Sequence, residues 1–285
     1  MNGSSGRGRT IAAAGLAMLV VVLAIALFAP WISPQNPYDL AKLDLLDARL
    51  EPGAKSIGSS FTYLLGTDGQ GRDMLSAIFY GLRVSLLVGV ASGMIALALG
   101  GLLGVWAAYA GGRAEQLLMR MVDIQLGFPA ILVALILIAV LGKGVDKIII
   151  ALVCVQWAYY ARTARAAAVV ERNKEYIDAA RSLGFSHARI VLRHLLPNAL
   201  PPLIVVGTVQ VAHAIALEAT LSFLGLGLPA TEPSLGLLIA NGYEYLLSGR
   251  YWISVYPGLA LLATILSINL VGDQLRDQFN PRLAR

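Results

Sequence analysis

Six apolar runs, each about as long as a bilayer is thick, constrain the fold of this 285-residue chain more than any other feature. A helix needs about 20 apolar residues to cross the hydrocarbon core of a membrane. Of all residues, 57% are hydrophobic and only 14% are charged, which excludes an ordinary soluble domain of this length. We therefore predict an all-α membrane protein with six transmembrane helices, whose apolar parts are Ile11–Pro30, Val84–Gly112, Ile124–Gly142, Ile148–Ala168, Pro201–Leu228 and Ile253–Val271.

The polar segments between the runs divide the chain. The predicted parts are a cytoplasmic N-terminus at 1–9, a first transmembrane helix at 10–32, an extracytoplasmic loop at 33–80, and a five-helix core at 81–285 that ends in a cytoplasmic tail at 273–285. A cleaved signal peptide is an alternative for the first run, because Ala24-Ile25-Ala26 could be a cleavage site. The apolar core of this run is longer than that of a typical signal peptide, which favours retention.

The distribution of lysine and arginine predicts the orientation. Six spans place both termini on one side, and fourteen of the 22 basic residues fall on that side against eight on the other. Cytoplasmic loops carry the excess of basic residues in membrane proteins. Both termini and the charged segment at 171–197 are therefore predicted to be cytoplasmic.

Glycine and proline predict local features of the runs. Gly89/Gly93 and Gly100/Gly104 are small residues four apart, a spacing that permits close approach of another helix in lipid. Pro129, near the start of the third run, predicts a kink, and the charged residues from Glu115 to Asp123 before it predict a short turn.

A glycine-rich stretch at 65–73, Leu-Gly-Thr-Asp-Gly-Gln-Gly-Arg-Asp, lies in the long polar loop. No strand precedes it and no Gly-Lys-Ser/Thr follows it, so it is neither a dinucleotide-binding fingerprint nor a P-loop. We predict a turn that leads into a helix at Met74–Leu82.

The only long charged stretch in the second half runs from Glu175 to Asn198. Tyr176, Ala180 and Leu183 are spaced i, i+4, i+7, which predicts one apolar face on a short helix.

The rest of this stretch contains the signals of a turn. Gly184 stands where a left-handed residue would end the helix, Ser186 is a candidate N-cap, and Pro197 suits the first turn of the next helix. The prediction is a helix, a tight turn, a second helix, and then a new apolar helix.

These residues resemble the EAA loop of binding-protein-dependent ABC importer permeases. Asp178-Ala179-Ala180, Gly184 and Leu196-Pro197 match the carboxylate, two alanines, glycine and Leu-Pro of that loop in type and spacing. Asp178 stands where the pattern has glutamate, and His194 where it has an aliphatic residue.

Other stretches look like those of dipeptide, oligopeptide and nickel permeases: residues 65–73, 222–227, and 269–277 near the end. The resemblance implies a type I ABC importer in the bacterial inner membrane. Its parts would be this chain, a sister permease, two cytoplasmic ATPases that bind ATP and Mg²⁺, and an extracytoplasmic binding protein that delivers peptide or a similar solute.

In such families the loop corresponding to 171–197 couples the permease to the ATPase. The residues that the resemblance assigns to coupling are Glu175, Tyr176, Asp178, Ala179, Ala180, Leu183, Gly184, Leu196 and Pro197.

Three polar residues in apolar runs are candidates for the translocation path. Glu218 is the costliest to place in a membrane and is expected to face the bundle interior or an aqueous path, unless it snorkels to the outer interface. His213 and Asn269 are weaker candidates, with helix-packing hydrogen bonds as the alternative.

The sequence has no signature of an enzyme. It contains no Walker A motif, no His or Cys pattern for a metal, and no nucleophile elbow. The single cysteine, Cys154, is expected to be a small buried apolar residue. We expect no bound cofactor and no nucleic-acid binding, while membrane lipid is an expected partner. An ion-gradient-driven secondary transporter is the alternative function, although no inverted repeat is evident, and a receptor or scaffold is a third possibility.

Overall fold

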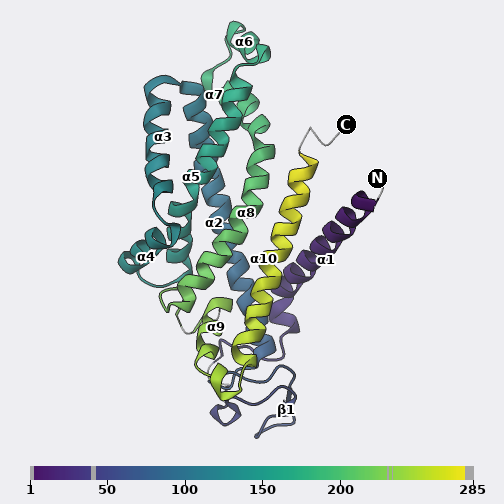
Figure 1. Cartoon of the computed structure of the whole chain (residues 1–285). Coiled ribbons are helices and arrows are strands. Elements are labelled where there is room, and N and C mark those ends of the chain that lie inside the picture. The colour runs from purple at the N-terminus through teal and green to yellow at the C-terminus, as the bar shows by residue number, and fades with distance from the viewer. Residues whose placement is uncertain (1–2, 40–42, 230, 233, 280–285) are drawn as a thin grey trace.

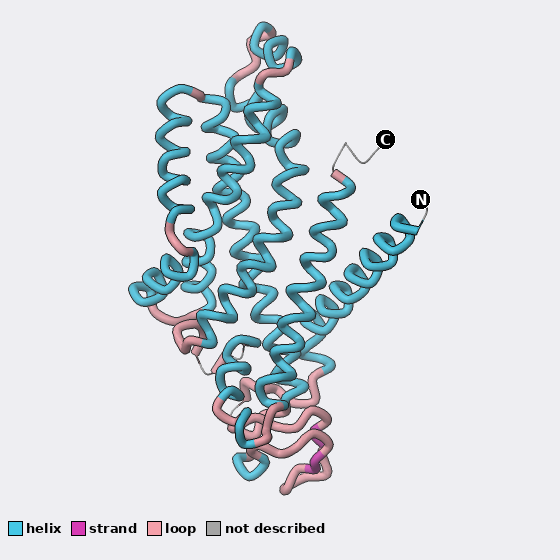
Figure 2. The backbone as a smooth tube through the Cα atoms, in the orientation of Figure 1, coloured by secondary structure: helices cyan, strands magenta, loops and turns pink. Residues whose placement is uncertain are grey.

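The structure, a computed structural model, describes residues 3–39, 43–229, 231–232 and 234–279. Long helices lie side by side along one axis, and most loops gather at the two ends (Figures 1 and 2). We call these ends the α6 end and the β1 end. The helices are α1 Gly3–Ile32, α2 Met74–Ala110, α3 Gly112–Gly127, α4 Ala130–Leu141, α5 Val145–Arg172, α6 Glu175–Ser182, α7 His187–Ile190, α8 Leu196–Phe223, α9 Leu235–Tyr243 and α10 Trp252–Gln278.

The all-α prediction is confirmed, but the count of six spans is not. Within the described residues, four helical segments are long and apolar enough to cross a membrane, at Ala12–Ile32, Met74–Ala110, His187–Phe223 and Trp252–Gln278. A fifth span results if α3 and α4 count as one. The last residues of the predicted tail, 280–285 with Arg282 and Arg285, lie outside the described residues.

Helix α5 covers the fourth predicted run but falls outside that count. It lies among other helices, with α2 on one side and α3, α4 and α8 also in contact with it. A helix that contacts protein rather than lipid tolerates polar side chains, here including Gln156 and Tyr160, both of which are fully buried. Its moderate hydropathy therefore reflects its central position.

The third predicted run is broken. Helices α3 and α4 meet at an angle of 91° around Phe128 and Pro129, so the predicted kink at Pro129 is confirmed. The predicted run Ile124–Gly142 therefore starts in the last residues of α3 and continues as α4, rather than forming one helix. The prediction of a turn at Glu115–Asp123 is wrong, because these residues are part of helix α3. Two ion pairs, Arg165 with Glu115 at 2.6 Å and Arg162 with Asp123, hold α3 against α5.

Helix α2 is one continuous helix, so the separately predicted helix at Met74–Leu82 is its first part. Its two glycine pairs face different neighbours. A Cβ on Gly104 would lie 2.3 Å from the carbonyl oxygen of Ala161 in α5, whereas one on Gly89 would lie 2.5 Å from Cγ1 of Ile215 in α8. The predicted close approach is therefore confirmed, and α2 packs tightly against both α5 and α8.

The turn at 65–73 is an ordered element of the β1 end. The Asp68 carboxylate accepts hydrogen bonds from the backbone N–H groups of Gln70 and Arg72, and Asp73 caps α2 through the N–H of Ser76. The Trp252 indole of α10 donates to the carbonyl of Thr67 at 3.2 Å. The stretch therefore joins the starts of α2 and α10, in agreement with the predicted turn.

Two strands and one helix were not predicted from the sequence. The loop after α1 contains the antiparallel strands β1 Ala54–Lys55 and β2 Thr62–Tyr63. The polar interval before α10 contains α9, capped by Ser234. A Cβ on Gly236 of α9 would lie 2.3 Å from the carbonyl oxygen of Ala219, so α9 packs directly on the end of α8. Pro233 in this interval lies outside the described residues.

Candidate coupling site

The segment that resembles the EAA loop forms the tip of the α6 end (Figure 1). Helix α6 begins with acidic Glu175 and includes Asp178 in its first turn, where negative charge is favourable against the helix dipole. Arg181 in the last turn pairs with Asp178 at 3.3 Å. This short helix is therefore stabilised locally, although it projects from the bundle.

Gly184 ends α6 as predicted. Its φ is +71°, in the left-handed region that glycine adopts without strain. The N–H of Phe185 donates to the carbonyl of Ala180 at 3.1 Å, and the N–H of Gly184 donates to the carbonyl of Arg181 at 3.0 Å. This pair of bonds is a Schellman motif, and it sets the direction in which the chain leaves α6.

The second part of the turn differs from the prediction. Ser186 caps α7 by accepting from the N–H of Arg189, as predicted. Pro197 lies in the first turn of α8, as predicted, but α7 runs into α8 without a break through a π-helical turn at Val191–Leu195. The N–H of Leu196 donates to the carbonyl of Val191, five residues back. Proline lacks an N–H for the carbonyl four residues back, and widening the preceding turn accommodates it within a continuous helix.

Tyr176, Ala180 and Leu183, predicted to form one apolar face of α6, do not lie on the same side. Ala180 is only 5% exposed and packs with Ile177 against the interior, together with Ile190 and Leu195. Tyr176 and Leu183, by contrast, are 40% and 74% exposed. The period of the helix was read correctly, but the side that faces the bundle is centred on Ile177.

The outward side of α6 follows from this correction. The predicted coupling residues Glu175, Asp178 and Ala179 are exposed, as is Gly184, and Leu183 places a large apolar side chain at the tip. Leu196 is half-buried and Pro197 is exposed, both on the helix that leads back into the bundle.

A hydrogen-bond chain holds the base of α6 to the neighbouring helices. The Tyr176 hydroxyl donates to Glu171 of α5 at 2.9 Å and accepts from the amide of Asn198 of α8 at 3.1 Å. The same amide donates to the carbonyl of His194 at 2.7 Å, inside the π-helical turn. Burial and the adjacent Glu171 carboxylate raise the pKa of Tyr176, so its hydroxyl remains a donor.

His194 stands where the EAA pattern has an aliphatic residue, and aromatic packing explains the difference. Its ring stacks on Phe185, with centroids 5.9 Å apart and planes 21° apart, and meets the Tyr176 ring edge-on. Arg189 lies over the other ring of this stack, 5.0 Å from the centroid of Phe185. The imidazole therefore fills the space of an aliphatic side chain and links the two halves of the turn.

The end of α2 is joined to the same segment. The Tyr109 hydroxyl lies 2.6 Å from Nδ1 of His187, and the Arg181 guanidinium lies over the Tyr109 ring at 5.4 Å. Arg172 donates to the carbonyl of Ala108 in the last turn of α2. A movement of α6 and α7 would therefore be passed to α2, α5 and α8 together.

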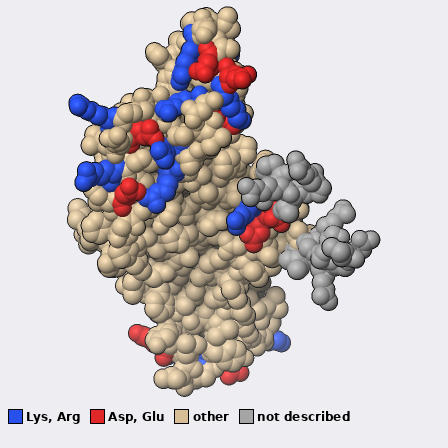
Figure 3. Space-filling view, turned by 45° about the horizontal axis from the view of Figure 1, so that its top comes forward, with Lys and Arg blue, Asp and Glu red and all other residues tan. Residues whose placement is uncertain are grey.

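Charged side chains crowd around this end of the molecule, and an uncharged band separates them from a few at the other end (Figure 3). Such a band is what a membrane-embedded surface requires, because an exposed charge in the hydrocarbon core is costly.

Glu218 is fully buried near the β1 end of α8. Its carboxylate accepts hydrogen bonds from Ser85 of α2 at 2.9 Å and from Ser222 at 2.7 Å. The predicted interior position is confirmed, and snorkelling to the interface is wrong. Because both carboxylate oxygens are engaged and none of the side chain is open to solvent, Glu218 acts here as a link between α2 and α8.

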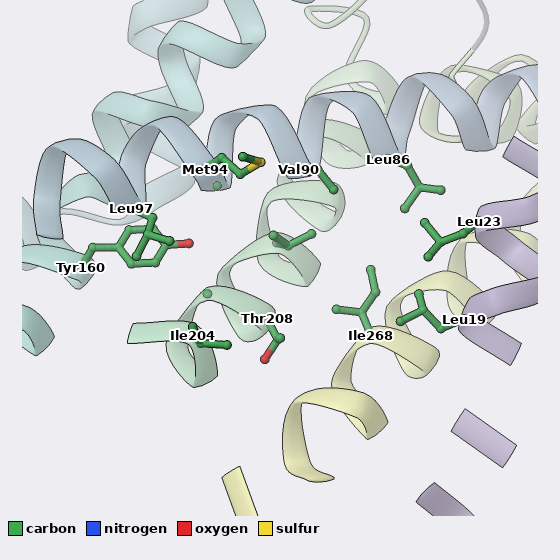
Figure 4. A pocket seen from close by; sticks show the side chains of 13 residues that line it. Leu19, Leu23, Leu86, Val90, Met94, Leu97, Tyr160, Ile204, Thr208 and Ile268 are labelled. Carbon is green, nitrogen blue, oxygen red and sulfur yellow. The ribbon is translucent and has the colours of Figure 1, made fainter. Parts of the chain in front are cut away.

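His213 and Asn269 are both half-buried, and within the described parts of the chain neither side chain makes a hydrogen bond. An apolar cavity of about 320 Å³ lies between α1, α2, α8 and α10, with the Tyr160 side chain at one end (Figure 4). None of the three candidate path residues lines it.

Some important residues were missed from the sequence. Ile177 is the inward anchor of α6, and Asn198 connects three elements. Ile177 and Ala180 are spaced i, i+3, so periodicity offered a signal, whereas nothing local marked Asn198. Cys154 was expected to be buried but is exposed, because α3 ends beside it, where Gln125 donates to its carbonyl, and the chain then bends away.

Comparison with known proteins places this geometry in a family. Residues 100–285 match the family described as "Binding-protein-dependent transport system inner membrane component", and residues 7–52 match the "N-terminal TM domain of oligopeptide transport permease C". The chain belongs to the binding-protein-dependent transport permeases. This permease is therefore a membrane subunit of a transport system.

Several curated relatives cover nearly the whole permease. It is 39% identical over 269 residues to the di/tripeptide transport system permease protein DppC of Pseudomonas aeruginosa. The match covers 94% of this chain and 87% of that protein. It is 41% identical over 272 residues to the dipeptide permease protein DppC of Escherichia coli, covering 95% and 89% respectively.

A solved structure of the MetNI methionine ABC transporter in an inward-facing conformation has a similar fold. The TM-score is 0.59 at 22% identity, over 73% of the permease and 98% of that chain. The predicted fold class, that of a type I ABC importer permease, is confirmed.

Proposed function

We propose that this permease forms half of the translocation path of an ATP-driven importer of peptides or similar small solutes. Relatives about 40% identical over almost the whole chain carry the names of dipeptide and tripeptide permeases, and this observation supports peptides as the solute. The other half of the path would come from a sister permease, in a heterodimer.

Two cytoplasmic ATPases, which would bind ATP and Mg²⁺, would supply the energy, because this sequence contains no Walker A motif. Helix α6 would dock on an ATPase through its outward side, with Leu183 at the tip. Support comes from the contacts of this segment, which join α6 and α7 to three long helices. Closure of the ATPases would then rotate those helices and alternate access to the path.

The test is uptake by proteoliposomes that contain the permease, its sister subunit, the ATPases and the binding protein. We expect uptake of radiolabelled L-alanyl-L-alanine with Mg²⁺-ATP, and none with a non-hydrolysable analogue. Uptake that needs no ATP and stops when ionophores collapse the ion gradients would instead establish a secondary transporter.

The proposed orientation places both termini and α6 in the cytoplasm of a bacterial inner membrane, with the loop at 33–80 outside. Ser59 and Ser186 are both exposed, so cysteines at these positions can be labelled. In a Cys154→Ala background, we expect an impermeant thiol reagent to label Ser59→Cys but not Ser186→Cys in spheroplasts, and both after lysis. The reverse pattern in spheroplasts would invert the topology.

A further inference from the structure

A second cavity, of about 430 Å³, lies at the β1 end. Three segments that are distant in the sequence form it: the turn at 65–73, the end of α8, and α9 with the two residues that follow it. Its volume is in the range of small-molecule sites. It shares no lining residue with the apolar cavity between α1, α2, α8 and α10, and it lies outside the coupling segment at 171–197.

The walls combine polar groups with a small apolar patch. Gln70, Asn241 and Tyr245 supply amide and hydroxyl groups, while Leu237 and Ala240 supply the apolar part. Sites that bind small ligands have this composition, because a few convergent polar groups orient a ligand whose remaining surface is buried.

The charges of the cavity are not balanced. Asp68 is already held by Arg72, with 3.4 Å between its Oδ2 and the guanidinium Nε, and by two backbone N–H groups. Glu244, which is exposed, has no ion-pair partner within the described parts of the chain. Arg49 adjoins the cavity but lies over the ring of Tyr245, 5.7 Å from its centroid. Glu244 is thus the carboxylate of this cavity that is available to bind a cation.

Two helices also direct their carboxyl ends toward this cavity. Helix α8 ends at Phe223 in a Schellman motif, in which Gly225 has φ +74° and the N–H of Leu226 donates to the carbonyl of Leu221. Helix α9 ends at Tyr243, with Glu244 as its C-cap. The carboxyl end of a helix carries a partial negative charge that favours a cation.

Behind the cavity wall lies a further acidic group. Ser222, which lines the cavity, donates to Oε1 of Glu218 at 2.7 Å. Ser222 therefore places a buried carboxyl group one hydrogen bond behind the wall of the cavity.

We propose that this cavity is an entry site that binds the N-terminal ammonium group of a peptide on the outer side of the permease. Glu244 accepts a charge-assisted hydrogen bond from the ammonium group, and the amide and hydroxyl groups hold the first peptide unit. Leu237 and Ala240 contact its apolar side chain. This inference rests on the proposed function, because it identifies the part of a peptide that the permease itself would recognise.

The test measures protection of a cysteine in the cavity. Ala240→Cys is made in the Cys154→Ala background, and its rate of modification by a small maleimide is measured in the full purified complex without binding protein. We expect L-alanyl-L-alanine to slow modification and N-acetyl-L-alanyl-L-alanine to have no effect, because acetylation removes the positive charge.

A charge variant and a matched control test the role of Glu244. Glu244→Gln should raise the half-protecting concentration of L-alanyl-L-alanine about tenfold, because the neutral amide still accepts a hydrogen bond but lacks the negative charge that strengthens it. Glu51→Gln removes an exposed carboxylate that does not line the cavity and should change nothing.

Equal protection by the acetylated peptide, or an unchanged midpoint in Glu244→Gln, would overturn the inference. If, without peptide, the cysteine is modified more slowly in NaCl than in KCl, the cavity binds a metal cation instead, and the inference is overturned. If the wild-type complex takes up L-alanyl-L-alanine but the peptide does not protect the cysteine, the site is wrong and the proposed function stands. If the complex takes up no peptide, the proposed function fails and the site fails with it.

Discussion

Replacing Gly104 with alanine is expected to destabilise the folded permease by about 1–3 kcal/mol or more, the usual cost of overpacking a core. The new Cβ would lie 2.3 Å from the carbonyl oxygen of Ala161 and 2.8 Å from Cβ of Ala164. Neither is the flexible end of a long side chain, so α2 and α5 must move apart. The purified protein should therefore lose its monodisperse state at a lower temperature than the wild type.

Gly101→Ala is the matched control. It is the same substitution one turn earlier in α2, where the new Cβ would lie 3.6 Å from Cδ1 of Leu203, an ordinary contact. Alanine favours a helix over glycine by up to about 1 kcal/mol, so this variant should be neutral or more stable. Equal thermal shifts in the two variants would mean that the contact between α2 and α5 is not what glycine at 104 preserves.

Gly184→Val is expected to abolish most coupled transport while leaving the membrane helices folded. Valine at φ +71° is strained by about 1–3 kcal/mol, and no neighbouring atom lies within 4 Å of the new Cβ, so the effect is on the backbone alone. The Schellman motif would open, and α6 would no longer point in its present direction. We expect binding-protein-stimulated ATP hydrolysis and peptide uptake to fall at least about tenfold. Opening the turn relieves the strain, and relief of about 1.4 kcal/mol lowers the population of the native turn relative to the open one about tenfold.

Gly184→Asn separates backbone strain from side-chain bulk. Asparagine enters the left-handed region more readily than other residues with a Cβ, so this variant should keep most of the stimulated hydrolysis and uptake. Thermal stability should match the wild type in both variants, because Gly184 is exposed at the tip. Full coupling in Gly184→Val would remove this turn from the mechanism.

The corrected orientation of α6 also changes the meaning of a charged substitution at Ala180. If this residue faced an ATPase, Ala180→Arg would act by blocking docking. Because Ala180 packs inside this chain with Ile177, Ile190 and Leu195, the arginine would instead bury a charge against α7 and the π-helical turn and disturb the loop itself.

Local sequence determined much of this protein. The apolar runs specify helices that must cross lipid, and the spacing of Gly100 and Gly104 specifies where another helix can approach. The turn after α6 also follows from local chemistry, because a left-handed residue favours glycine and an N-cap favours serine. These features depend on residues only a few positions apart, so they can be predicted without knowledge of the fold.

Tertiary structure decided what depends on distant neighbours. Periodicity showed that α6 has an apolar side, but only the positions of α7 and the π-helical turn after it made Ile177 its centre. Proline predicted a kink in the third run, yet the 91° angle comes from how α3 and α4 each pack on α5. One of the two hydrogen-bond partners of Glu218 is Ser85, 133 residues away, which no local pattern could reveal. The direction of a side chain is set by the surfaces that close around it, and those surfaces exist only once the helices have packed.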